Sequence, residues 1–342
     1  MLSTCQSGFE ALLAREFHEL HQWTVTEQGP GWVRLDAECA VASLVFPHLS
    51  LLSPVELRGD SVNALAARIS DFFLNSVKDE RIGGEWPSIW MGPQEITGLG
   101  RRVSGVEAAW QEILKRKLSR VARLAVPDLP RARINNVQRG LFVFFVDFNR
   151  AFVSREAVVH GPRRMADDPL APSRSYLKVE EAYLVQGEEP QPGQSVCDLG
   201  AAPGGWSYSA AKRGAHVVAI DNGPLKGGAL GHPQIDHRRE DAFRFVPPHG
   251  QTFDWLFCDL VEEPHHVMQH IVERWLAARW CRRFVVNLKF GRVDPIGLLR
   301  ELRAPGGPLG VHAPAARIHH LFHDREEFTL VGSVPEGSHH FL

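Results

Sequence analysis

One stretch constrains the fold of this 342-residue chain more than any other: SVCDLGAAPGGWSY, residues 195–208. A short apolar run ends in an acid, and a turn with three glycines and a proline follows it. A glycine-rich turn between a strand and a helix lets backbone N–H groups approach a ligand closely. We therefore expect a ligand-binding turn that contains Gly200, Ala202, Pro203, Gly204 and Gly205.

The chain around this stretch alternates between short apolar runs and helical patterns from about residue 173 onward. Such alternation predicts an α/β fold with a mostly parallel sheet and helices on both of its faces. The predicted strands are 195–200, 216–221, 252–260 and 282–290, and the predicted helices are 175–185, 204–214 and 265–281. Ligands of such sheets bind beyond the carboxyl ends of the strands.

Polar residues stand at the ends of the other predicted strands as well. Asp221 ends the second strand, 21 residues after the first glycine of the turn, and an acid at this spacing is typical of a site for a ribose diol. Asp241 follows a further short segment, and Asp259 and Lys289 lie at the ends of the next two strands. Pro203 has no N–H, so the turn offers one donor fewer to a ligand. The glycines of the turn also do not follow the G-x-G-x-x-G pattern that binds a pyrophosphate. These features favour a nucleoside cofactor without phosphates, S-adenosylmethionine.

The front half of the chain has a different pattern. Residues 1–50 predict strand, helix and strand, and residues 51–156 predict a second unit. Within the second unit we expect a helix over 61–77, a loop rich in Gly and Pro over 83–100, a long helix over 106–124, and paired strands over 140–148 and 151–159. The following segment, up to about residue 175, is rich in Pro, Gly and charge, which is typical of a linker.

The net charge of −2 hides an uneven distribution along the chain. Residues 1–100 contain 6 Lys and Arg against 13 Asp and Glu, whereas residues 101–150 contain 11 against 4. The long predicted helix of the basic segment places four cations on one face, namely Arg116, Lys117, Arg120 and Arg123. We call this set the basic face; it is either a contact surface for RNA phosphates or a solvated helix surface.

Composition and spacing exclude several classes of protein. The chain contains no run of 18 apolar residues, so no membrane span is expected, and the N-terminus does not resemble a signal peptide. The five cysteines lie far apart and form no C-x-x-C, so neither zinc nor a disulfide framework is expected. Histidine pairs at 265–266 and 319–320 have no cysteine partners and no H-E-x-x-H helix around them. We expect a cytoplasmic protein with no metal site and no membrane partner.

The stretch DLGAAPGGWS resembles the first motif of the FtsJ-like family of ribose 2′-O-methyltransferases. Members of that family transfer a methyl group from S-adenosylmethionine to a ribose hydroxyl of RNA, using a Lys-Asp-Lys-Glu tetrad. The segments SRSYLKVEEA, FCDL, VVNLKF and DREEFTLV match the family in order and imply the tetrad Lys178, Asp259, Lys289 and Glu327, with Glu326 as a rival of Glu327. The resemblance also implies that Ser175 and Asp259 lie near the cofactor. Trp206 is expected either beneath the cofactor turn or simply in the core.

Both halves of the chain are similar to a narrower family, the bacterial 23S ribosomal RNA cytidine 2′-O-methyltransferases M. The stretches CQSGFEALLAREF, DNGP, NLK and HDREE carry this similarity, although the first motif has APGGW where CPGGW is expected in relatives. The resemblance implies four parts: a ferredoxin-like subdomain over 1–52, a THUMP RNA-binding domain over 53–158, a linker over 159–172, and a Rossmann-like FtsJ methyltransferase domain over 173–342.

The function implied by this resemblance is methylation of the ribose 2′-hydroxyl of a cytidine in 23S ribosomal RNA. The RNA partner is either naked 23S rRNA or an early precursor of the large subunit. Two alternatives remain at this point: a 2′-O-methyltransferase for another RNA, and a non-catalytic RNA-binding factor for ribosome assembly. The intact tetrad argues against the second alternative. The oligomeric state stays open.

The tetrad has a chemical rationale. A ribose hydroxyl is a poor acid and a poor nucleophile, so the enzyme must align it with the methyl group and remove one proton. Lys289 is the expected base, and burial next to the cation of Lys178 is expected to lower its pKa from about 10.4 toward about 7–8. Asp259 and Glu327 are expected to orient the two ammonium groups.

Overall fold

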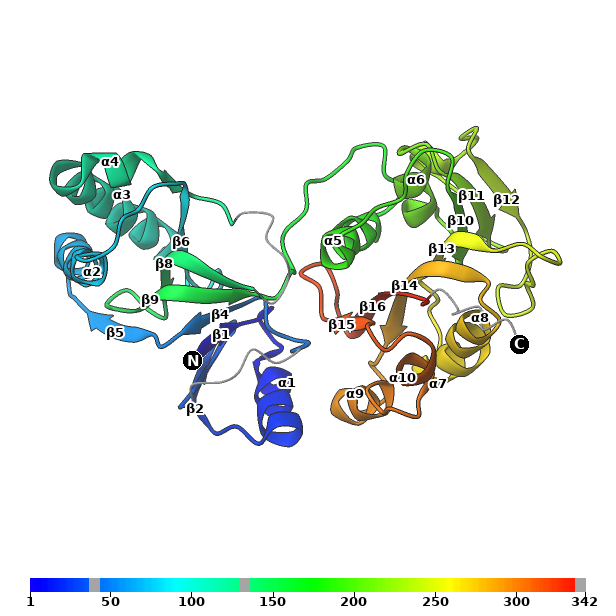
Figure 1. Cartoon of the computed structure of the whole chain (residues 1–342), viewed down its shortest axis with the longest axis horizontal. Coiled ribbons are helices and arrows are strands. Elements are labelled where there is room, and N and C mark those ends of the chain that lie inside the picture. Colours follow the sequence, from blue (N-terminus) through cyan, green and yellow to red (C-terminus); the bar gives the residue numbers. More distant parts are fainter. Residues whose placement is uncertain (37–43, 130–135, 336–342) are drawn as a thin grey trace, which may run out of the picture. The chain divides into compact units, whose positions relative to one another are not determined.

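The computed structural model describes residues 1–36, 44–129 and 136–335 of the chain (Figure 1). The chain divides into two compact units, Met1–Gly161 and Pro162–Leu342. Within the described ranges, no helix is both long enough and apolar enough to cross a membrane.

The first unit contains a mixed sheet of nine strands among the described residues. In sheet order they are β2 (Val25–Gly29), β3 (Trp32–Leu35), β1 (Leu2–Thr4), β4 (Leu49–Leu52), β9 (Arg150–Val159), β8 (Val137–Phe145), β6 (Trp86–Met91) and β7 (Ala125–Val126), and β5 (Val55–Arg58) also pairs with β9. The helices are α1 (Glu10–Arg15), which continues into a π-helical turn (Glu16–Leu20), α2 (Val62–Ser76), α3 (Leu99–Lys117) and α4 (Ser119–Arg123).

Strand β8 explains why the run GLFVFFVDF is almost continuously apolar. Alternate residues of a strand point to opposite faces of the sheet. Val143 and Phe145 pack with Phe73 and Trp110 of helices α2 and α3. Phe144 belongs to a second cluster on the other face. Both faces of β8 are therefore buried, and the predicted strand pair 140–148 and 151–159 is confirmed as β8 and β9.

Two predictions for this unit are wrong. Residues 83–100, expected to form a loop, contain β6, which pairs in parallel with β8. Glycines and prolines in and around the run WPSIWM conceal its strand pattern. The helix expected over 106–124 instead begins at Leu99, and it is broken at Leu118, where the backbone leaves helical geometry with φ −139° and ψ 63° before α4 begins.

The second unit contains a seven-stranded sheet among the described residues. In sheet order its strands are β12 (Ile235–Arg238), β11 (His216–Ile220), β10 (Ser195–Leu199), β13 (Phe253–Cys258), β14 (Cys281–Lys289), β16 (Glu327–Ser333) and β15 (Arg317–His319). The first five run parallel, and β16 and β15 are added in antiparallel pairing. The predicted α/β fold with a mostly parallel sheet is confirmed for this unit.

Helices cover both faces of this sheet. They are α5 (Tyr176–Gln186), α6 (Gly205–Ala211), α7 (Pro264–Val267), α8 (Arg274–Ala277), α9 (Pro295–Leu302) and α10 (Pro308–His312), with a π-helical segment (Met268–Glu273) joining α7 to α8. Two connections cross the sheet in opposite directions. One leads from β10 through α6 to β11, and the other leads from β13 through α7 and α8 to β14. Since such crossovers are right-handed, their helices lie on opposite faces. The order reverses between β10 and β13, and ligands of these folds bind at such a reversal.

The segment 159–172, expected to be a linker, makes defined contacts with the second unit. The backbone N–H of Arg163 donates to the carboxylate of Glu181 on α5 at 2.8 Å. The backbone N–H of Met165 donates to Nε2 of His323 at 2.9 Å. Most of this segment is therefore attached to the second unit.

Candidate active site

The glycine turn after β10 adopts a conformation that requires glycine at two positions. Gly200 and Gly204 have φ angles of 77° and 105°. A Cβ atom at Gly200 would lie 2.7 Å from the side chain of Leu260, and one at Gly204 would lie 2.5 Å from Cβ of Ala229. Helix α6 begins at Gly205, so the turn presents bare backbone between a strand end and a helix.

Two of the three acids expected at the cofactor, Asp221 and Asp241, lie in different surroundings. Asp221, which directly follows β11, accepts hydrogen bonds from the N–H of Ala202 at 3.0 Å and the N–H of Gly223 at 2.7 Å. Its carboxylate is thereby held against the glycine turn. Asp241 is exposed beyond β12, where its Oδ1 accepts a hydrogen bond from the N–H of Phe243 at 2.9 Å.

Ser175 and Trp206 join the turn to the start of α5. Nε1 of Trp206 donates to the carbonyl of Ser175 at 2.9 Å. The indole is buried, and its ring centre lies 5.9 Å from that of Phe257 on β13. A Cβ atom at Gly205 would lie 3.1 Å from Oγ of Ser175. The structure therefore brings Ser175 to the turn, whereas Trp206 is a buried packing residue that holds the turn against α5.

Asp198 is a buried acid of this region that the sequence reasoning missed. It lies on β10, two residues before Gly200, and its Oδ2 accepts a hydrogen bond from Oγ of Ser207 at 2.6 Å. Its Oδ1 is buried and has no hydrogen-bond partner within the described ranges. Burial raises the pKa of this carboxyl to about 7. An acid immediately before a glycine turn was the signal in the sequence that could have identified it.

All four residues of the expected tetrad meet at one end of the sheet. Nζ of Lys289 lies 2.5 Å from Oδ1 of Asp259 and forms an ion pair with Oε2 of Glu327. Lys178 on α5 forms an ion pair with Oε1, the other oxygen of Glu327. Glu327 is buried and bridges the two lysines, whereas Glu326 is exposed.

Strand register explains how distant residues come together here. Lys289 is the last residue of β14 and Glu327 the first of β16, and the antiparallel register places them directly opposite each other. Directly opposite side chains lie on the same face of a sheet and contact each other. Asp259 directly follows the parallel neighbour β13. Helix α5 supplies Lys178 from the same face.

The pKa of the Lys289 ammonium is shifted in the direction opposite to the expected one. Burial acts to lower the pKa of its ammonium, but the carboxylates of Asp259 and Glu327 outweigh burial and raise that pKa above its ordinary value. Burial likewise acts to raise the pKa of Glu327, and the two lysines outweigh it and lower that pKa. The expected lowering of the Lys289 pKa toward neutrality is therefore wrong, because the charged groups that contact its ammonium are two carboxylates and not Lys178.

Two further acids lie behind the tetrad, and the sequence reasoning missed both. Glu181, three residues after Lys178, is fully buried and accepts backbone hydrogen bonds from Arg163, Phe322 and His323 at 2.8, 2.8 and 3.1 Å. It joins α5 to the segment that leads to Glu327. Asp324, in that segment, is also buried. Only the burial of these acids distinguishes them, and a single sequence does not reveal it.

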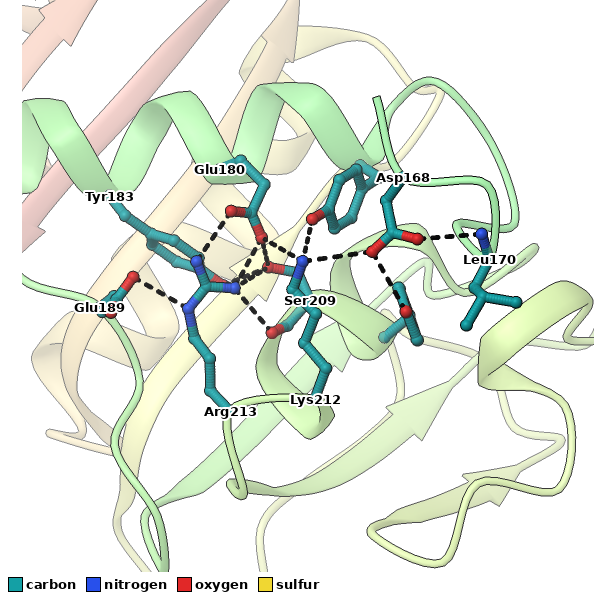
Figure 2. Close-up of polar contacts among 10 residues, drawn as sticks. Asp168, Leu170, Glu180, Tyr183, Glu189, Ser209, Lys212 and Arg213 are labelled. Carbon is teal, nitrogen blue, oxygen red and sulfur yellow. Dashed lines mark hydrogen bonds and ion pairs between the residues drawn. The ribbon is translucent and has the colours of Figure 1, made fainter. Parts of the chain in front are cut away.

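A cluster of polar contacts fixes α5 against α6 (Figure 2). Arg213, just after α6, forms a two-pronged ion pair with Glu180 of α5 at 2.6 and 2.8 Å and contacts Glu189 at 2.9 Å. Oγ of Ser209 donates to the carboxylate of Glu180 at 2.7 Å. Lys212 reaches from the same region to the carboxylate of Asp168 at 3.4 Å (Figure 2). The helix that carries Lys178 is thus fixed to the helix that follows the glycine turn.

The basic face belongs to the first unit and is divided between two helices. Arg116 and Lys117 lie in α3, Arg120 and Arg123 lie in α4, and all four side chains are exposed. The break at Leu118 means that helical spacing does not place the four cations on one continuous face. Among the described residues, no three His, Cys, Asp or Glu side chains are grouped so that they could hold a metal ion.

Comparison with known proteins agrees with this geometry. Residues 171–288 match the family model described as FtsJ-like methyltransferase. The chain is 37% identical over 268 residues to the ribosomal RNA large subunit methyltransferase M of Laribacter hongkongensis, which covers 72% of this chain and 71% of the relative. The chain belongs to the methyltransferase M family. A member from Stenotrophomonas maltophilia is 31% identical across 97% of this chain and 96% of its own length.

As a member of the methyltransferase M family, the protein is an S-adenosylmethionine-dependent methyltransferase. The residues around the glycine turn fit that cofactor. A Cβ atom at Gly200 or Gly204 would collide with Leu260 or Ala229, so the turn keeps bare backbone at the carboxyl end of β10. The buried Oδ1 of Asp198 offers a hydrogen-bond acceptor for a cationic group, and Asp221 lies at the turn with its carboxylate fixed.

Proposed function

We propose that this protein transfers a methyl group from S-adenosylmethionine to the ribose 2′-hydroxyl of a cytidine in 23S ribosomal RNA. One observation carries the proposal: two lysines and two acids, from α5, β14, β16 and the residue after β13, meet at the end of the sheet that also carries the glycine turn. The RNA substrate is supported by the relatives, which are named ribosomal RNA large subunit methyltransferases.

In this proposal the glycine turn and its neighbours hold the cofactor. Bound S-adenosylmethionine supplies a methyl group that is already activated by its sulfonium. Asp221 binds the ribose diol, Asp198 accepts a hydrogen bond from the ammonium group, and Ser175 and Asp241 complete the site. The fixed carboxylate of Asp221 supports its role, because a preorganised acceptor loses little entropy on binding.

The tetrad aligns the ribose hydroxyl and receives its proton. Asp259 and Glu327 keep Lys289 positively charged, because they raise its pKa. The hydroxyl proton can therefore move to Nζ of Lys289 only as Nζ passes one of its own protons to a carboxylate. Glu327 contacts both lysines and is the carboxylate best placed to take part in this exchange. Lys178 holds Glu327 in position.

The front half of the chain has the role of holding the RNA. We assign residues 1–52 to a ferredoxin-like subdomain, 53–158 to a THUMP domain, 159–172 to a linker and 173–342 to the methyltransferase domain. The exposed cations Arg116, Lys117, Arg120 and Arg123 support an RNA-binding role for the second of these parts. The substrate is 23S rRNA, naked or in an early precursor of the large subunit, and we expect the reaction in the cytoplasm.

Mapping of 2′-O-methyl groups on total RNA tests the proposal. Cells without the protein should lack one such group at a cytidine of 23S rRNA, and the wild-type chain should restore it. The Lys289→Ala chain should not restore it. Loss of a methyl group from a different RNA would mean that this other RNA is the substrate. An unchanged methylation map would favour a non-catalytic role in ribosome assembly.

A further inference from the structure

Three exposed arginines of the second unit, Arg164, Arg174 and Arg325, lie beside the tetrad and take no part in the mechanism above. We call them the rim arginines. Arg174 lies four residues before Lys178, at the point where α5 begins. The backbone N–H of Arg325 donates to Oε1 of Glu327 at 3.1 Å. Two of the rim arginines are therefore placed by the same elements that place the tetrad.

Hydrogen bonds on either side of Arg164 hold this residue at the same site. The backbone N–H of Arg163 donates to the carboxylate of Glu181 on α5 at 2.8 Å, and the N–H of Met165 donates to Nε2 of His323 at 2.9 Å. The carboxylate of Glu181 also accepts the N–H of His323 at 3.1 Å. One buried acid thus joins the segment around Arg164, helix α5 and the segment that contains His323.

The charges of Arg164 and Arg174 both act on the imidazole of His323. Burial first, and then these two charges, lower the pKa of His323, although the carboxylate of Asp167 acts in the opposite direction. The neutral imidazole accepts the N–H of Met165 at Nε2, so it carries its own proton on Nδ1, which is a hydrogen-bond donor. Two guanidinium groups and one imidazole donor are therefore gathered beside the tetrad.

The rim arginines form no ion pair within the ranges that the structure describes, and the exposed acids of their segments, Asp167 and Glu326, do not pair with them. By contrast, Arg213 of the same unit has a two-pronged partner in Glu180. Neighbouring cations repel one another, so an anion that binds between them is favoured. The planar fork of a guanidinium matches the oxygens of a phosphate. The rim arginines therefore fit a phosphate group.

The chemistry of RNA determines which phosphate reaches this place. The 2′-oxygen and the 3′-phosphate are attached to neighbouring carbons of one ribose, so a hydroxyl held at Lys289 brings its own 3′-phosphate next to the tetrad. Resting on the proposed function, we propose that the rim arginines and Nδ1–H of His323 bind the 3′-phosphate of the nucleotide that is methylated. This contact fixes the ribose and keeps its 2′-oxygen aligned with the methyl group.

Neutral substitutions at two rim arginines test the proposal. The full-length double variant Arg164→Gln with Arg174→Gln is compared with the wild type on an unmodified 23S rRNA transcript. In filter binding, the log–log salt slope should be smaller by about 0.7–0.9, the contribution of one phosphate. The single-turnover rate at saturating RNA and S-adenosylmethionine should fall at least about tenfold, because the hydroxyl is less well aligned. Cofactor affinity in calorimetry should equal that of the wild type.

Two single variants separate the phosphate contact from a general effect of charge. Arg174→Lys keeps the charge and loses the planar fork, so its salt slope should equal that of the wild type while its rate lies between those of the wild type and Arg174→Gln. Arg282→Gln is the matched control, because it removes an exposed arginine from the start of β14, at the other end of the strand from Lys289. Its slope and rate should be unchanged.

A wild-type slope and rate in the double variant would overturn the proposal, and so would an equal loss in Arg282→Gln. A smaller slope with a wild-type rate at saturating RNA would place the two arginines at a phosphate away from the reacting ribose, which also contradicts it. Methylation of the transcript by the wild type supports the proposed function whatever the variants do. If the wild type did not methylate it, the proposed function would fail, and the salt slopes would still test the phosphate contact.

Discussion

At the scale of single residues, Lys289 is the position where we expect a substitution to lower the rate of methyl transfer most. Its ammonium contacts two carboxylates, and its removal leaves Asp259 and Glu327 without the cation that they share. Lys289→Ala should lower the single-turnover rate of methyl transfer by about 10²–10⁴-fold, the usual contribution of a group that moves protons. Cofactor affinity, measured by calorimetry, should stay within about threefold, since the lysine acts in the transition state.

The control for this prediction is Lys78→Ala, which removes an exposed lysine of the first unit. It should leave both the rate and the cofactor affinity unchanged. Turnover by Lys289→Ala within about threefold of the wild type would mean that alignment of the reactants suffices, and the tetrad mechanism would be wrong.

Asp221 is the residue on which cofactor binding should depend most directly. Asp221→Ala removes a carboxylate that accepts two backbone N–H groups of the binding region. The loss of charged hydrogen bonds should weaken S-adenosylmethionine binding by about 1–3 kcal/mol in calorimetry. Asp236→Ala, which removes an exposed acid from β12, should leave the affinity unchanged. Equal affinities in the two variants would exclude Asp221 from the cofactor site.

At the scale of elements, the contact between α5 and α6 holds the tetrad beside the glycine turn. Arg213→Gln leaves the carboxylate of Glu180, which is mostly buried, without its two-pronged partner. The unfolding free energy of the second unit should fall by about 1–3 kcal/mol in urea denaturation, because the carboxylate loses its two hydrogen bonds to Arg213 and keeps only the more distant cation of Lys212 at 3.6 Å. The double variant Glu180→Gln with Arg213→Gln should recover part of this loss, since no unpaired charge remains.

Arg282→Gln is the matched control for this contact. Arg282 pairs with Asp254 at 3.1 Å, but its side chain is 67% exposed, so the change should cost less than about 1 kcal/mol. If Arg213→Gln cost no more than Arg282→Gln, the contact between α5 and α6 would contribute nothing measurable to stability.

The sequence predicts most elements of the second unit and fewer of the first. The four predicted strands of the second unit are confirmed as β10, β11, β13 and β14, because buried parallel strands give short, continuous apolar runs. Strand β6 was missed, since its apolar run contains a proline and lies among glycines. The long predicted helix breaks at Leu118, although no proline or glycine marks the break.

At the scale of the whole molecule, the basic face is the part of the first unit that we expect to bind RNA. Reversal of Arg116, Arg120 and Arg123 to Glu should weaken binding of 23S rRNA and flatten its salt dependence. Each phosphate contact contributes about 0.9 to the log–log slope on duplex DNA and about 0.7 on single strands. Filter binding at several salt concentrations measures both effects. Cofactor affinity should not change, because these residues lie in the first unit and the glycine turn lies in the second.

A matched triple reversal tests whether position or total charge is responsible. Arg282, Arg300 and Arg303 of the second unit can be changed to Glu, which alters the net charge by the same amount. If both triple variants lowered the affinity and the slope equally, net charge alone would explain the effect. An RNA affinity and slope equal to wild type in the first variant would identify the basic face as a solvated surface.

The sequence by itself predicted the glycine turn and the strand ends around it, and its resemblance to the FtsJ-like family implied Lys178, Asp259 and Lys289 and left Glu326 as a rival of Glu327. These features are local, because they depend on backbone conformation and on residue order within short segments. Only the tertiary structure decided that Glu327 and not Glu326 faces the lysines, since strand register sets which side chains meet. The tertiary structure also raised the pKa of Lys289 and buried Asp324 beside the tetrad. The two carboxylates that raise the Lys289 pKa, against the effect of burial, lie 30 and 38 residues away in the sequence and meet the lysine only when the chain has folded.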